Sequence, residues 1–197
     1  MSVSHHPSEA TLTLHAAGGL SEGAAMVVGG HLDACPACRR AVAMMEAVGG
    51  ALVEDMSPAA MAPDALDRAL AGLDRPEAAP PAPPKPGPRR WLAPGVWLTP
   101  EPVRGPAGER AYRLQVPPGR TLPKHSHNGA EFVLVLAGCF MDVAQLYQAG
   151  DFAESGPEHE HHPKVVGDEP CVCLIWTEAP IRMRSPLGKV LQPWLGI

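Results

Sequence analysis

The chain contains 197 residues with a formal net charge of −5 and five cysteines. Its apolar runs are far shorter than the roughly 18 residues of a membrane-spanning helix, and the residues after Met1 have neither the basic nor the apolar region of a signal peptide. We therefore expect a cytoplasmic protein without a membrane partner, whose cysteines serve as metal ligands or redox groups rather than as a disulfide framework.

The composition changes along the chain. Residues 1–75 contain no Phe, Trp or Tyr and are rich in Ala, Met and Leu, a helical bias, whereas the nine aromatic residues all lie from Trp91 onward, among valine-rich runs that favour strands. Seven of the thirteen residues from Pro76 to Pro88 are proline, which favours an extended, semi-rigid linker. The sequence thus predicts an α+β protein with a small all-α domain at 1–75, a linker at 76–90 and an antiparallel β-domain at 91–197.

Charge divides the chain in the same way. Residues 1–75 carry nine acidic and four basic side chains, whereas residues 76–197 carry twelve of each. An acidic helical domain repels phosphate backbones, so direct binding of nucleic acid is not expected. The acidity suits a basic protein partner, although solubility alone explains it equally well.

A candidate metal-binding cluster lies in the helical region. His31, Cys35 and Cys38 form an H-x3-C-x2-C pattern in which helical periodicity places His31 on the buried face of one helix and both thiols at the start of the next apolar face. Two thiolates and an imidazole bind tetrahedral zinc if a fourth ligand joins them. His5 and His6 both precede a further helix, and His6, which is adjacent to it, is the preferred candidate. The alternative is that both cysteines are small core residues.

The region from residue 64 to residue 73 predicts one more amphipathic helix. Leu66, Ala69, Leu70 and Leu73 form a narrow apolar face. The simplest interpretation is that this face packs on the three preceding helices.

A second candidate cluster opens the β-domain. His125 and His127 are two residues apart, so they project to the same face of a strand, and Glu131 begins an apolar run that predicts a buried strand. Imidazoles combined with a carboxylate favour a divalent transition metal. Histidines also gather on solvated loops, where they bind nothing.

The spacing G-x5-H-x-H-x3-E-x6-G around these residues resembles the first signature of the cupin barrels, also called double-stranded β-helices. A second cupin signature opens at Gly150, and the family spacing implies a last metal ligand at His161. The proline and glycine usually found between these positions are displaced here. His159 and His162 flank His161, and either could replace it.

Three further cysteines lie in the β-domain. Cys139 begins a predicted strand, and Cys171 and Cys173 point to the same face of another strand. Core packing is the simplest interpretation, and the alternative is a thiol pair near the metal that responds to oxidants.

Taken together, these motifs resemble one family. The helix start at His6-Pro-Ser-Glu, the His31 to Cys38 pattern, the proline-rich linker and the carboxy-terminal cupin are similar to the ChrR-type anti-sigma factors of proteobacteria. The resemblance implies that the fourth helix helps to clasp a partner. It also implies one zinc ion on His6, His31, Cys35 and Cys38, and zinc or another divalent transition metal on His125, His127, Glu131 and His161.

The predicted function is that of an anti-sigma factor. It sequesters an extracytoplasmic-function sigma factor and releases it on a chemical, oxidative stress signal, a small molecule or an oxidant sensed by the cupin. The alternative is a cupin metalloenzyme, because three histidines and a glutamate leave open positions on a metal for dioxygenase or isomerase chemistry. No substrate-binding set is recognisable and the acidic zinc domain has no catalytic use, so we expect no enzyme. A DNA-binding regulator is disfavoured by the acidic domain.

Overall fold

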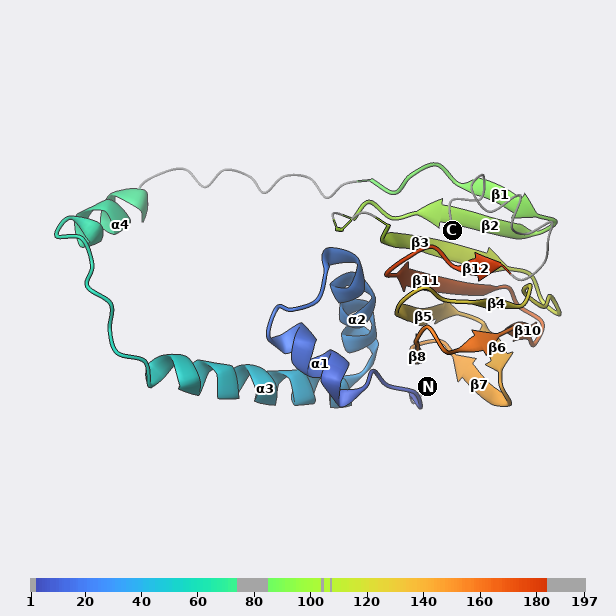
Figure 1. Cartoon of the computed structure of the whole chain (residues 1–197), viewed down its shortest axis with the longest axis horizontal. Coiled ribbons are helices and arrows are strands. Elements are labelled where there is room, and N and C mark those ends of the chain that lie inside the picture. Colours follow the sequence, from blue (N-terminus) through green and yellow to red (C-terminus); the bar gives the residue numbers. More distant parts are fainter. Residues whose placement is uncertain (1–2, 74–84, 104, 107, 184–197) are drawn as a thin grey trace.

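The computed structural model describes residues 3–73, 85–103, 105–106 and 108–183. Within these residues four helices precede twelve short strands (Figure 1). The helices are α1 (Glu9–Ala16), α2 (Glu22–Ala34), α3 (Pro36–Glu54) and α4 (Ala65–Leu73). The strands are β1 (Arg90–Ala93), β2 (Val96–Pro100), β3 (Arg110–Val116), β4 (His125–Ser126), β5 (Glu131–Ala137), β6 (Cys139–Asp142), β7 (Gln145–Gln148), β8 (Phe152–Ser155), β9 (Glu160–His161), β10 (Lys164–Val166), β11 (Cys171–Thr177) and β12 (Arg182–Met183).

The strands form a cupin-like arrangement of three sheets. A six-stranded sheet has the order β1-β2-β3-β11-β5-β8, and two three-stranded sheets have the orders β10-β6-β7 and β12-β4-β9. Every pairing between these strands is antiparallel. The described strands do not form one continuous ladder, but all three sheets contribute side chains to a common interior. The predicted α+β class is thus confirmed. Most of the predicted linker lies outside the described residues.

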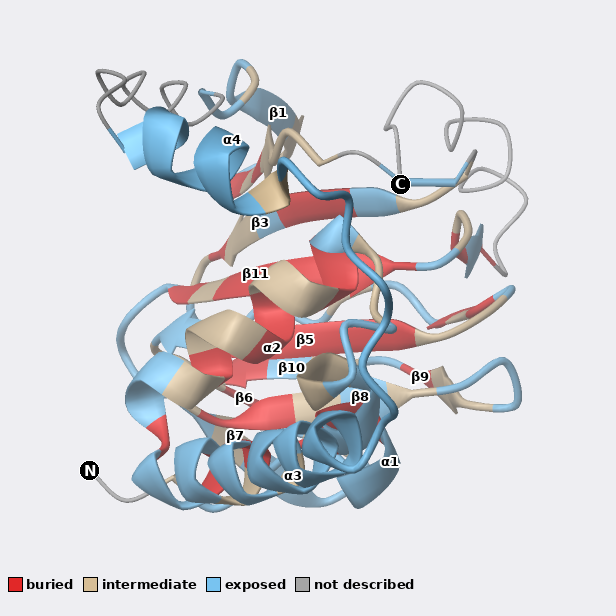
Figure 2. Cartoon of the chain, turned by 90° about the vertical axis from the view of Figure 1, so that its left-hand side faces the viewer, coloured by how far each residue is buried: buried red, intermediate tan, exposed pale blue. Residues whose placement is uncertain are grey.

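The central strands are buried on both faces, which explains why they appear in the sequence as continuous apolar runs. On β5, Phe132 and Leu134 belong to a core shared with the helices, whereas Val133 and Val135 belong to the interior of the barrel. This alternation follows from the two-residue period of a strand. Figure 2 shows α2 lying across these buried strands.

Helix α2 approaches the sheet closely because glycine lies on its contact face. A Cβ atom on Gly23 would lie 2.5 Å from Cδ1 of Trp176, and one on Gly30 would lie 2.7 Å from Cδ2 of Leu134. Both distances are too short for real contacts, so α2 could not pack at this distance with larger residues. The two predicted domains therefore share one hydrophobic core; their division at the predicted bounds stays a prediction.

Helix α3 is buried only in its first half. Cys38 and Val42 are buried, whereas Leu52 near the end of the helix is 67% exposed. Helix α4 has no buried residue and lies apart from the other helices (Figure 1). The simplest interpretation of α4, packing on the first three helices, is thus wrong for this structure.

Candidate metal centres

The four residues predicted for the helical metal site come together at the junction of three chain segments. His6 precedes α1, His31 lies in the last turn of α2, and Cys35 and Cys38 begin α3. Nδ1 of His6 lies 3.4 Å from the Sγ atoms of both Cys35 and Cys38, and Nε2 of His31 lies 3.4 Å from Sγ of Cys38. Ligands about 2.0–2.3 Å from a tetrahedral zinc ion lie roughly 3.5 Å apart, so the donors fit zinc.

The local sequence explains this convergence. The side chain of Ser8 caps α1, and Pro36 occupies the first turn of α3, where its missing N–H costs no hydrogen bond. The chain leaves the helical conformation only at Cys35, the single residue between α2 and α3, where φ is −116° and ψ is 99°. His5, the less favoured alternative, instead places its ring 4.3 Å from that of Tyr147 in the barrel.

The protonation of this cluster is suited to a cation. Nδ1 of His31 lies 2.9 Å from the carbonyl oxygen of Gly150. Because a carbonyl only accepts, Nδ1 carries the proton and Nε2 presents its lone pair to the cluster. Burial lowers the pKa of His31, which keeps the imidazole neutral. Burial and the neighbouring Cys35 thiol raise the pKa of Cys38 to about 11, so metal binding must displace a thiol proton there.

The four residues predicted for the barrel site also come together. His125 on β4 is paired with His161 on β9, and Glu131 begins β5. Nε2 of His161 lies 3.0 Å from Nε2 of His125 and 3.1 Å from Nε2 of His127. The Oε2 atom of Glu131 lies 3.6 Å from Nε2 of His127. All four side chains are buried.

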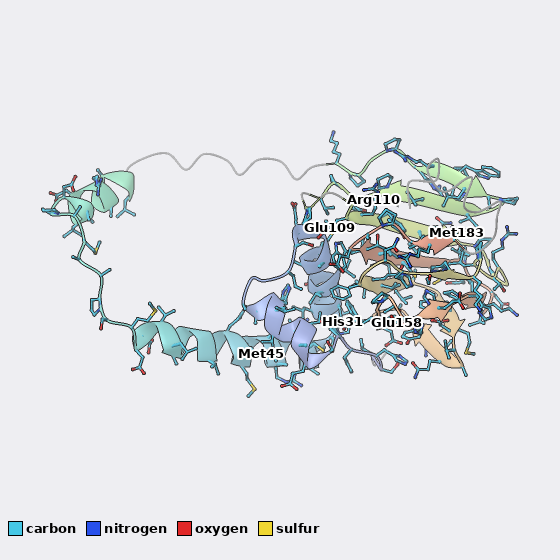
Figure 3. The ribbon with its side chains drawn as sticks, in the orientation of Figure 1. His31, Met45, Glu109, Arg110, Glu158 and Met183 are labelled. Carbon is cyan, nitrogen blue, oxygen red and sulfur yellow. The ribbon has the colours of Figure 1, made fainter. Side chains whose placement is uncertain are left out.

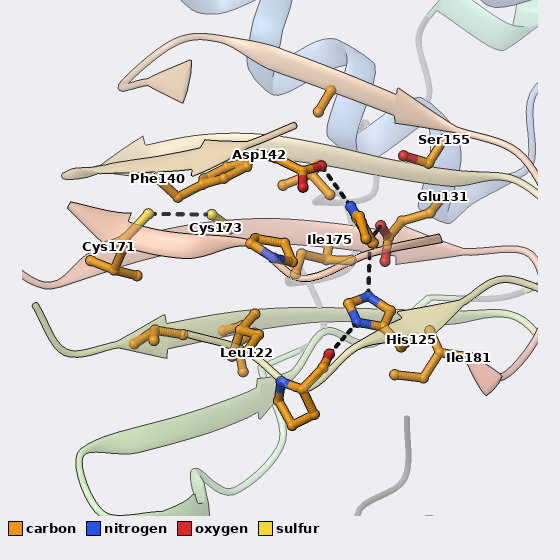
Figure 4. A pocket seen from close by; sticks show the side chains of 18 of the residues that line it. Leu122, His125, Glu131, Phe140, Asp142, Ser155, Cys171, Cys173, Ile175 and Ile181 are labelled. Atoms are coloured by element: carbon orange, nitrogen blue, oxygen red, sulfur yellow. Dashed lines mark hydrogen bonds and ion pairs between the residues drawn. The ribbon is translucent and has the colours of Figure 1, made fainter. Parts of the chain in front are cut away.

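The hydrogen bonds around this site show that a cation fits it. Nδ1 of His125 donates to the carbonyl oxygen of Pro123 (2.9 Å), and Nδ1 of His161 donates to Asp142 (2.7 Å; Figure 4). Both Nε2 atoms therefore present lone pairs to each other at 3.0 Å, which is repulsive unless a positive ion lies near them.

The charge of the barrel site leads to the same conclusion. Burial, with the neighbouring imidazoles, lowers the pKa of His125 to about 4 and that of His127 to about 3. Burial raises the pKa of Glu131 to about 7. Neutral imidazoles and one carboxyl group can accept a divalent ion without first losing protons from the rings.

Sequence reasoning missed Asp142. This carboxylate lies at the end of β6, in the interval between the two cupin signatures, and it also lies 3.6 Å from Nε2 of His159. Burial acts to raise the pKa of Asp142, but the hydrogen bond and charge of His161 and then of His159 outweigh burial and lower it. His159 is thus near the site through Asp142 and not among the four donors, and His162 is exposed.

A cavity of about 510 Å³ extends inward from the barrel cluster (Figure 4). Its walls are mainly apolar, and Leu122, Phe140 and Ile175 are among them. The thiols of Cys171 and Cys173 also line it, with their sulfur atoms 3.6 Å apart. The hydrogen bond with Cys171 and burial raise the pKa of Cys173, so its thiol stays protonated and weakly nucleophilic.

The fold and these clusters define a cupin-like barrel joined to a small helical domain with a candidate metal centre. Residues 89–179 match the family model described as the ChrR Cupin-like domain. Over an alignment of 215 residues the chain is 37% identical to the anti-sigma-E factor ChrR of Cereibacter sphaeroides, and the alignment covers 100% of both chains. The chain therefore belongs to the ChrR family of anti-sigma factors.

A solved structure is similar over most of the chain. The crystal structure of Rhodobacter sphaeroides SigE in complex with the anti-sigma ChrR has a TM-score of 0.80 and 36% identity, and the match covers 90% of this chain and 100% of that one. The prediction of an anti-sigma factor rather than an enzyme is thus confirmed. No helix in the described part of the chain is long and apolar enough to cross a membrane.

Proposed function

We propose that this protein sequesters an extracytoplasmic-function sigma factor between α3 and α4. The observation that carries this proposal is a pair of unpartnered apolar faces. On α3, Met44, Val48 and Leu52 follow one another at intervals of four residues and are 63–72% exposed. On α4, Leu66 and Leu70 continue the same kind of face. Residues spaced by three or four lie on one side of a helix, so each helix presents a continuous apolar surface.

The two helices leave room for a partner between them. Figure 1 shows α3 extending away from the barrel, with α4 beyond its end. Exposed apolar surface of this extent marks an interaction site in a protein. The similar crystal structure, SigE in complex with the anti-sigma ChrR, supports a sigma factor as the occupant. RNA polymerase and its sigma factors act in the cytoplasm, and the proposal includes that location.

The proposal assigns different roles to the two metals. Zinc on His6, His31, Cys35 and Cys38 has four protein ligands and no open position, which is the arrangement of a structural site. Zinc or another divalent transition metal on the barrel cluster keeps open positions for a ligand. The barrel cluster lies at the cavity described above. A small molecule or an oxidant that enters this cavity therefore reaches the cluster directly. We assign the sensing of a chemical, oxidative signal to this part of the barrel.

The test is binding of the full chain to the extracytoplasmic-function sigma factors of its own organism, each purified and titrated in turn. Replacing Val48 and Leu66 with glutamate places charge on both faces and should weaken binding by at least about thirtyfold, because central interface residues contribute about 2 kcal/mol or more each. Leu146→Glu, an equally radical change at a 39% exposed position on the barrel strand β7, is the matched control. Equal affinities for the helical variant and the unsubstituted chain would contradict the proposal.

A further inference from the structure

The turn between β7 and β8 contacts the segment that carries the first candidate zinc ligand. Asp151, only 1% exposed, accepts hydrogen bonds through Oδ1 from the backbone N–H groups of Ser4 (2.7 Å) and His5 (3.1 Å). The N–H of Phe152 donates to the carbonyl oxygen of His5 (3.1 Å). Residues 4 and 5 are thus fixed against the barrel by main-chain bonds, and His6 is the next residue.

The same turn contacts a second candidate ligand. The carbonyl oxygen of Gly150 accepts the hydrogen bond from Nδ1 of His31 described above. Gly150 has a φ of +94°, and a Cβ there would lie 3.0 Å from a methyl carbon of Val3 and 3.5 Å from Cβ of Ala34. Only glycine combines this backbone conformation with such a close approach. Figure 3 shows His31 at the boundary between the helices and the barrel.

We infer that Gly150 and Asp151 are positioning residues for the zinc cluster, so that the barrel sets how tightly the helical domain holds its metal. The inference rests on the zinc site of the proposed function. Groups that hydrogen-bond to metal ligands fix the orientation of those ligands, and their loss typically weakens metal binding by roughly ten- to a hundredfold. Here such a group comes from the barrel and not from the helices themselves.

Strand β8 links the turn that contacts the zinc cluster to the barrel cluster. The strand begins beside the turn at Phe152 and ends at Ser155, which is paired with Glu131 of the barrel cluster and lines the cavity. One four-residue strand therefore connects both candidate metal centres. Any event at the barrel centre that shifts β8 changes the zinc affinity, and by thermodynamic reciprocity zinc binding changes the affinity at the barrel centre.

A neighbouring contact provides a matched control. Glu154, also on β8, accepts hydrogen bonds from the backbone N–H of Ser8 (3.1 Å) and the hydroxyl of Thr11 (2.8 Å). It therefore joins α1 to the same strand through a carboxylate, but it contacts residues two or more positions after His6, whereas Asp151 contacts the two residues that directly precede His6. Asp151→Asn and Glu154→Gln make the same change of charge at the same interface.

The experiment is a titration of the metal-free, reduced full chain with Co²⁺, followed by displacement with Zn²⁺. Charge-transfer absorption between cobalt and thiolate reports the helical site alone, because the barrel cluster contains no sulfur donor. Asp151→Asn should weaken binding there about tenfold or more and shift the cobalt bands, as reoriented ligands would. Glu154→Gln should leave both affinity and bands as in the unsubstituted chain.

A second variant tests the contact from its other side. Ser4→Pro removes the backbone N–H that donates to Asp151 and leaves the barrel sequence intact. It too should therefore weaken cobalt and zinc binding. This variant provides the test if Asp151→Asn fails to fold. Unchanged affinity and spectrum in Ser4→Pro and in folded Asp151→Asn would overturn the inference while leaving the zinc site standing. An unsubstituted chain without thiolate–cobalt absorption would overturn the zinc site itself.

Discussion

Asp142 shows how a single side chain outside the ligand set controls a candidate ligand. By accepting the Nδ1 proton of His161 at 2.7 Å, it presents Nε2 to the barrel cluster. Asp142→Ala should therefore lower the barrel metal affinity by roughly ten- to a hundredfold, as measured by titration of the metal-free chain. His159→Ala is the control, because His159 contacts Asp142 at 3.6 Å and the edge of the His161 ring but provides none of the four donors, and it should be close to neutral. The reverse order of effects would make His159 the ligand in place of His161.

Glu131 makes the barrel metal affinity depend on pH. Burial raises its pKa to about 7 in the folded, metal-free chain, so below that pH the carboxyl group binds a proton that a metal ion must displace. The rings of His125 and His127 compete for protons only at much lower pH, because burial lowers the pKa values of both to about 4 and 3. Affinity should therefore be constant above about pH 8 and fall about tenfold for each pH unit between 6 and 5. A binding isotherm independent of pH from 5 to 8 would contradict this role.

At this scale the sequence predicted the ligands better than their surroundings. Spacing alone brought His125, His127 and Glu131 together, because one strand and one tight turn determine their positions. The partners of the ligands are not part of the ligand patterns themselves: Asp142 falls between the two cupin signatures, and Gly150, which opens the second signature, is far in the sequence from His31, whose ring it contacts. The displaced proline and glycine of the second cupin signature suggested a loosely held His161, yet it is buried and hydrogen-bonded.

At the scale of elements, two glycines of α2 test whether helix propensity or packing determines how a glycine-to-alanine substitution changes stability. Gly23→Ala gains up to about 1 kcal/mol of helix propensity, but the new Cβ would lie 2.5 Å from the buried ring of Trp176. Overpacking typically costs about 1–3 kcal/mol, so the free energy of unfolding should fall. Gly29→Ala, on the same helix with nothing within 4 Å of its Cβ, should raise it by up to about 1 kcal/mol. Thermal or denaturant unfolding of the two variants decides, and a stabilised Gly23→Ala would show that α2 does not pack on the sheet in this way.

The helices also show where periodicity misleads. An apolar stripe predicts that a helix face will be covered, but it does not reveal by what. The stripe of α2 is covered by the sheet, a long-range contact that composition, with its change near residue 75, gave no reason to expect. The stripes of α3 beyond Met45 and of α4 are uncovered within the described chain. We assign these faces to the partner. The sequence pattern thus correctly predicted apolar helix faces, but their assignment to an internal core was wrong.

At the scale of the whole molecule, the two halves have cores of different kinds. One cluster lies wholly within the barrel and includes Val135, Phe140 and Ile175. The other joins the helices to the outer face of the sheet, and the helices contribute aliphatic and cysteine side chains but no aromatic ring to it. The barrel thus has a core of its own, whereas the helices depend on the sheet and, in our proposal, on zinc.

This difference predicts opposite consequences of removing each metal. Cys38→Ser should abolish zinc binding, reduce the helicity of α1–α3 and weaken sigma-factor binding, because metal binding supplies much of the folding free energy of so small a helical unit. The barrel should remain folded and keep its own metal. His125→Ala should empty the barrel site while leaving helicity and resting sigma-factor binding intact, and only the response to the proposed chemical signal should be lost. Metal analysis, circular dichroism and binding assays on the two full-length variants, beside the unsubstituted chain, measure each effect separately. A Cys38→Ser chain with full helicity and full affinity would refute the structural role of zinc, and an unchanged response in His125→Ala would refute sensing at the barrel metal.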